Sequence, residues 1–153
     1  MAEDSMERFS AQLDELVAGY RRAVEELDAA RRPGDGWMGL GRDPKRDPCH
    51  MAFYQGVGKA VEELSGLTAE QAGEAAELLL TLGLRTPVPD GMIPMLEAAQ
   101  GHALPLIPQL APERAALLLE RYAARYPRKG GRLPIHTQLL QALNRRAGGK
   151  TKI

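Results

Sequence analysis

Apolar residues recur at alternating spacings of three and four throughout residues 4–31. This spacing places them along one side of an α-helix, in the heptad arrangement that also lines coiled coils. The positions are Met6, Phe9, Leu13, Leu16, Tyr20, Ala23, Leu27 and Ala30, with Val17 and Val24 widening the stripe. The helix would be about 42 Å long. It would pack either along the body of the protein or against a second subunit, and we favour a homodimer through this helix.

A second helix is expected from Asp47 towards Leu64. The Asp47 carboxylate is a good N-cap, and Pro48 then occupies the first helical position, where its missing N–H costs nothing. The apolar stripe of this helix consists of Cys49, Phe53, Val57, Ala60 and Leu64. Cys49 therefore points into the stripe, and His50 lies at its border.

The remaining elements are predicted from caps, prolines and helical spacing. Thr68 and Gln71 form a capping-box pattern, and six of the eleven prolines between residues 87 and 112 exclude long helices there. Gly83-Leu84 resembles a Schellman ending of the helix that Thr68 begins. The expected elements are a helix from Thr68 to about Leu82, a short helix from Asp90 to Gln100, a single turn or 3₁₀ piece within Ala103–Leu110, and helices from Pro112 to Tyr126 and from Pro134 to about Gly148.

No stretch alternates with the period of two that a half-buried strand requires. We therefore predict an all-α fold, a five- to six-helix bundle with a long N-terminal helix and short, proline-rich helices in the second half. The expected organisation is a long amphipathic helix over 1–31, a Gly/Asp/Arg-rich loop over 32–46, a compact helical bundle over 47–147 and a flexible basic tail over 148–153.

Composition indicates the number of domains and the cellular compartment to expect. A chain of 153 residues fits one domain that can bury its own core. A single cysteine cannot form an internal disulfide, and the acidic N-terminus does not resemble a signal peptide. No apolar run approaches the roughly 20 residues of a membrane span. We expect a cytoplasmic protein without membrane contact, and the residue usage is compatible with a GC-rich bacterial genome.

Charge is unevenly distributed although the formal net charge is zero. From Arg125 onward there are eight basic residues and no acidic residue. This basic third could pair with the acidic N-terminal helix, which needs no further molecule, or it could contact nucleic acid. The candidate nucleic-acid contacts are Arg128, Lys129, Arg132, Arg145 and Arg146. Few aromatic residues accompany them, so we rank nucleic acid below the intramolecular alternative.

The loop before the second helix is the strongest candidate for a ligand or partner surface. Loops of this length in compact domains are often functional. The loop contains the only tryptophan, and an aromatic, a cation and a border histidine could meet where it joins the second helix. The candidate surface consists of Trp37, Met38, Arg42, Arg46, His50 and Tyr54.

The sequence gives only weak support for a catalytic site or a metal site. Cys49 lies near a helix N-terminus, which favours a thiolate, but its neighbour His50 diverges by about 100° around the helix. The spacing of Cys49, His50, His102 and His136 matches no short metal-ligand motif. We therefore expect no cofactor, no metal and no catalytic residue. The predicted function is a non-catalytic interaction or regulatory protein that binds an unidentified protein partner. The alternatives are nucleic-acid association and an enzyme or metal site around Cys49 and His50.

Overall fold

The computed structural model describes residues 2–30, 47–82, 84 and 87–149. Within these residues there are helices and no strand, which confirms the all-α prediction. The α-helices are α1 (Ala2–Ala30), α2 (Asp47–Glu62), α3 (Ala69–Leu80), α4 (Ile93–Ala99), α5 (Pro112–Arg125) and α6 (Pro134–Ala147). Three short 3₁₀ helices accompany α4, namely η2 (Asp90–Met92), η3 (Gln100–Ala103) and η4 (Ile107–Gln109).

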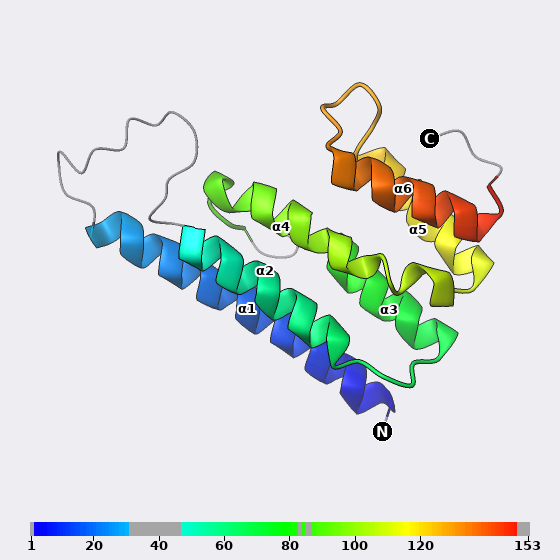
Figure 1. The fold of residues 1–153 in the computed structure, drawn as a ribbon, viewed down its shortest axis with the longest axis horizontal. Coiled ribbons are helices and arrows are strands. Elements are labelled where there is room, and N and C mark those ends of the chain that lie inside the picture. The colour runs from blue at the N-terminus through cyan, green and yellow to red at the C-terminus, as the bar shows by residue number, and fades with distance from the viewer. Residues whose placement is uncertain (1, 31–46, 83, 85–86, 150–153) are drawn as a thin grey trace.

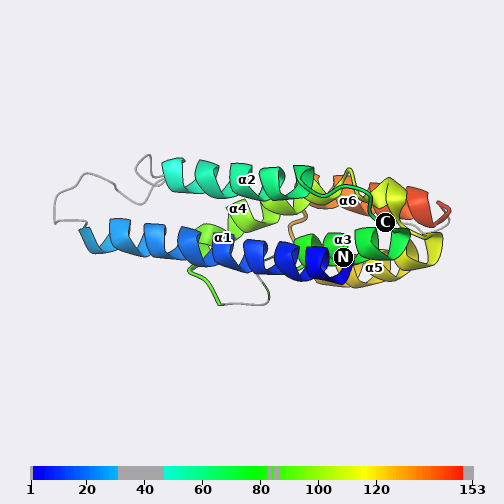
Figure 2. The same cartoon turned by 90° about the horizontal axis from the view of Figure 1, so that it is seen from below.

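The helices form two antiparallel pairs joined by a central layer. α1 and α2 run side by side in opposite directions, and α5 and α6 form the second pair (Figure 1). α3 packs against both α1 and α5, while α4 and η3 pack against α2 (Figure 2). The core therefore extends from one pair to the other through α3 and α4.

The buried face of α1 differs in detail from the heptad pattern. Its buried side chains are Met6, Phe9, Leu13, Val17, Tyr20 and Val24. These positions advance by 3.6 residues on average, the period of a straight α-helix, whereas the heptad pattern advances by 3.5. As a result Val17 and Val24 replace Leu16 and Ala23 as the most buried positions, and Ala30 is exposed. The described stripe of α1 is thus covered by α2 and α3 of the same chain.

The boundaries of α2 and α3 follow their local signals. α2 begins at Asp47 as expected and buries Phe53, Val57 and Ala60. The predicted capping box of α3 is present: the Gln71 backbone N–H donates to Thr68 Oγ1 at 3.1 Å, and the Thr68 N–H donates to Gln71 Oε1 at 2.9 Å. Gly83 lies outside the described residues, so the predicted Schellman ending remains a prediction.

Prolines start the last two helices. Pro112 opens α5 and Pro134 opens α6, each in the first turn, where a missing N–H is harmless. The region between α3 and α5 is a chain of short helical pieces, as its prolines predict. Leu139, Leu140 and Leu143 of α6 are fully buried, whereas Ile135 in its first turn is half-buried.

Candidate functional site

The structure describes two of the six residues of the predicted loop surface. Trp37, Met38, Arg42 and Arg46 lie outside the described residues, and His50 and Tyr54 lie on α2. His50 Nδ1 is hydrogen-bonded to the hydroxyl of Tyr20 on α1. The Tyr20 ring stacks on Phe53, with ring centroids 4.8 Å apart. His50 therefore joins α1 to α2.

Tyr54 is engaged with a different neighbour. Its ring packs against His102 of η3, with centroids 4.4 Å apart, and His102 Nε2 lies 3.0 Å from the Tyr54 carbonyl oxygen, to which it donates. Burial lowers the pKa of His102, although the Tyr54 carbonyl and Glu62 act in the opposite direction. A neutral imidazole thus links α2 to η3. Both described residues of the predicted surface therefore take part in helix packing: His50 contacts α1, and Tyr54 contacts η3.

The third histidine lies in the core between α5 and α6. His136 is 2% exposed, and its Nδ1 accepts the Leu133 backbone N–H at 3.0 Å. The Tyr126 ring stacks on the imidazole at 3.8 Å between centroids. His136 Nε2 lies 2.7 Å from a Glu97 carboxylate oxygen, but the ring N–H is not aligned with that oxygen, so the contact is electrostatic in character.

A buried polar cluster adjoins this histidine. The Tyr122 hydroxyl donates to Gln100 Oε1 at 2.7 Å, and Gln100 Nε2 donates to the Leu82 carbonyl at 3.3 Å. Burial is the largest influence that raises the pKa of both Tyr122 and Tyr126, so both hydroxyls remain protonated at neutral pH. This cluster could not be predicted from the sequence, because its residues come from elements that only the fold brings together.

The fold holds the three histidines in separate places. Within the described ranges, no group of three or more His, Cys, Asp or Glu side chains is placed to hold a metal ion. The three histidines belong to three separate interhelical contacts, and Cys49 is half-buried against the core.

The candidate nucleic-acid contacts do not form one surface. α5 and α6 are antiparallel and each about 21 Å long, so the loop with Arg128, Lys129 and Arg132 lies at one end and Arg145 and Arg146 at the other (Figure 1). Their positive charge is therefore divided between two places.

Three basic side chains of this region bind backbone carbonyls at helix ends. Arg125 donates to Leu80 O at 2.6 Å, Arg132 to Tyr126 O at 2.7 Å and Arg146 to Leu110 O at 2.6 Å. These oxygens belong to residues at the ends of α3, α5 and η4, where carbonyls lack helical partners. Three of the eight basic residues thus stabilise helix ends, and their bonds lead to α3, α5 and η4 rather than to the N-terminal helix. Arg114 and Arg121 of α5, which precede the basic third, both bind Glu77 of α3.

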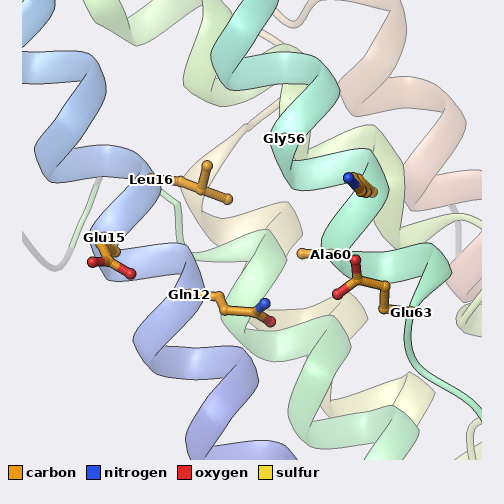
Figure 3. Close-up of a pocket in the computed structure, with 7 residues that line it drawn as sticks. Gln12, Glu15, Leu16, Gly56, Ala60 and Glu63 are labelled. Carbon is orange, nitrogen blue, oxygen red and sulfur yellow. The ribbon is translucent and has the colours of Figure 1, made fainter.

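A groove lies between α1 and α2, with a cavity of about 400 Å³. Gln12 and Leu16 point from α1 towards α2, where Gly56 and Ala60 form the opposite wall (Figure 3). Gly56 permits this close approach, because a Cβ there would lie 2.7 Å from Leu16 Cδ2. The rim carries charges of both signs, from Glu15, Lys59 and Glu63.

A second groove lies between α1 and α3, with a cavity of about 570 Å³. Its apolar side chains are Met6, Leu78 and Leu84, and Leu84 is 56% exposed. Among the described residues, the charged ones of its lining are acidic: Glu7, Glu74 and Glu77. The Glu77 carboxylate accepts from Arg114 and Arg121, both at 2.7 Å, which fixes this side of the rim.

The sequence indicates the α3 side of this second groove but not its α1 side. Leu78 lies beside the main apolar face of its helix, one turn after Glu74 and directly after Glu77. The sequence could not place Glu7 and Met6 opposite them, because the packing of α1 on α3 is a tertiary contact.

Three comparisons of the chain, with protein-family models, with curated proteins and with solved structures, found no match.

Proposed function

We propose that this protein is a non-catalytic interaction protein that binds a basic amphipathic helix of a partner protein in the groove between α1 and α3. The observation that carries the proposal is an apolar groove with an exposed leucine, Leu84, and a rim on which the charged side chains of the described residues are acidic. A large exposed leucine inside a groove is favourable to cover, because burying such a side chain contributes about 1.5–3 kcal/mol.

The shape of the site supports a helical ligand. A helix laid between two helices inserts side chains spaced by three, four and seven residues, and Met6, Leu78 and Leu84 provide the matching apolar contacts. Glu7 and Glu74 are exposed on opposite walls of the groove. Lysine or arginine side chains flanking the apolar stripe of a ligand would lie near both carboxylates, which increases the rate of association and selects the charge of the partner.

The groove between α1 and α2 is the weaker candidate for this role. Its rim combines Lys59 with Glu15 and Glu63, so it selects no single charge. Its wall on α2 consists of small residues, Gly56 and Ala60, and it presents no exposed leucine.

Two synthetic helical peptides test the proposal. Both carry the same leucine stripe, one flanked by lysines and the other by glutamates, and fluorescence anisotropy measures their binding to the full-length protein. We expect the lysine peptide to bind and its affinity to fall as salt is raised, because salt screens the exposed carboxylates.

Leu84→Asp should weaken the lysine peptide by at least about ten-fold, as loss of a central apolar anchor does in other interfaces. Leu117→Asp is the matched control, because Leu117 is also an exposed leucine, 40% accessible, but lies on α5 outside the groove. Equal binding of the two peptides, or an equal effect of the two variants, would contradict the proposal.

A further inference from the structure

A pocket beside α6 is lined by four apolar residues and two arginines. Its cavity measures about 290 Å³ and lies where α6 packs against η4. Leu104, Ile107 and Pro108 form one wall and Ala142 of α6 the other, and among the described residues Arg145 and Arg146 supply the charge of its lining. The pocket shares no residue with the groove between α1 and α3.

One of the two guanidinium groups is held in place by the fold. Arg146 Nε donates to the Leu110 carbonyl at 2.6 Å, and Leu110 is fully buried. Because this bond is made through Nε, the two terminal nitrogens of the guanidinium are available to other acceptors. A guanidinium presents its terminal N–H groups in a planar fork that matches a carboxylate, and a fork that is already oriented loses less entropy on binding.

We propose that this pocket binds an aliphatic monocarboxylic acid. The carboxylate accepts from Arg146, Arg145 supplies a second positive charge, and the hydrocarbon chain lies against Leu104, Ile107 and Ala142. An acid of eight carbons is the representative ligand. The assignment is independent of the function proposed above.

The arginines also have a structural explanation that the test must separate. Arg145 and Arg146 lie in the last turn of α6, where positive charge offsets the helix dipole. Lysine would serve that purpose equally well. It would not reproduce the planar fork or the bond from Nε to Leu110 O, so Arg→Lys variants distinguish recognition of a carboxylate from compensation of the dipole.

The experiment titrates the 153-residue protein with octanoate and observes by NMR the backbone amide signals of residues 142–146 and of the non-proline residues within 104–110. Octan-1-ol and octylammonium are the matched ligands that lack the carboxylate. We expect octanoate alone to shift these signals with saturation. Arg146→Lys should weaken octanoate by about ten-fold, the low end of the contribution of a charge-assisted hydrogen bond, while thermal unfolding shows the variant folded.

Ala142→Leu provides a second test that leaves both arginines intact. The larger side chain fills the cavity from α6, so octanoate binding should again be lost. Equal binding of octanol and octanoate, or unchanged affinity in both variants, would overturn the proposal. Preferential binding of N-acetyl-leucyl-leucine over octanoate would assign the pocket to a peptide C-terminus and would equally overturn the assignment to an aliphatic acid.

Discussion

Each of the three histidines packs against a tyrosine from another part of the fold: His50 on Tyr20, His102 on Tyr54, and His136 on Tyr126. An imidazole suits such contacts because it is flat enough to pack on a ring and still forms hydrogen bonds with both nitrogens. A charged imidazole in the same place would lose hydration. For His102, whose pKa burial lowers, acid therefore acts directly on the contact between η3 and α2.

For His102, the direction in which pH changes the free energy of unfolding follows from its pKa. Burial lowers its pKa below the ordinary value of 6.5, so between the two values the unfolded chain binds more protons than the folded one. The contribution to stability is complete above pH 6.5 and is lost as the pH falls towards the lowered pKa. We expect the free energy of unfolding, measured with urea, to fall more between pH 7.5 and pH 5 in the wild type than in His102→Gln. Equal pH dependence in the two proteins would contradict this account.

Glycines on helices provide a second prediction at the residue scale. A Cβ on Gly58 would lie 2.8 Å from His102 Cε1, whose ring is held by Tyr54, whereas the nearest atom to a Cβ on Gly19 is 4.0 Å away. Gly19→Ala should raise the free energy of unfolding by about 0.5–1 kcal/mol through helix propensity alone. Gly58→Ala should lower it by about 1–3 kcal/mol, because overpacking exceeds the gain in propensity.

Gly56→Ala is the intermediate case that completes this comparison. Its Cβ meets only the end of the half-buried Leu16 side chain, which can rotate away. Thermal and urea unfolding of the three variants should therefore rank Gly19→Ala above Gly56→Ala above Gly58→Ala. A stabilised Gly58→Ala would show that the contact between η3 and α2 tolerates displacement.

At the scale of elements, α1 is a helix whose apolar face is buried in the core of its own chain. Its buried stripe has the period of a straight helix and is covered by α2 and α3. We expect removal of residues 1–31 to abolish cooperative thermal unfolding, because it uncovers apolar side chains such as Phe53 and Val57 of α2. Circular dichroism measures the transition. A cooperative transition in residues 32–153 would contradict this role of α1.

The predicted homodimer through α1 remains a separate question, since a helix can cover its own core and pair through its outer face. Light scattering during gel filtration gives the mass of the intact protein in solution. A mass of two chains would support the homodimer prediction, and a mass of one chain would contradict it.

At the scale of the whole molecule, charge is organised by the fold rather than by position in the sequence. The acidic groove combines Glu7 of α1 with Glu74 of α3, residues more than 60 positions apart. The basic third is divided between the two ends of the α5–α6 pair, and several of its arginines bind helix-end carbonyls. The two proposed binding sites consequently have opposite charge. Among the described residues, none of the helices has the length and apolar character needed to cross a membrane.

The sequence by itself determined the helices, because their signals are local. The Thr68–Gln71 capping box, the Pro112 and Pro134 starts and the helical spacing of apolar residues act within one or two turns, and the structure confirms each of them. Tertiary structure alone decided which residues share a surface. It placed Tyr20 against His50, Glu7 opposite Glu74, and Arg146 beside the apolar residues of η4. Those contacts depend on how the helices pack, and helix packing depends on the shape of many side chains together rather than on any local pattern.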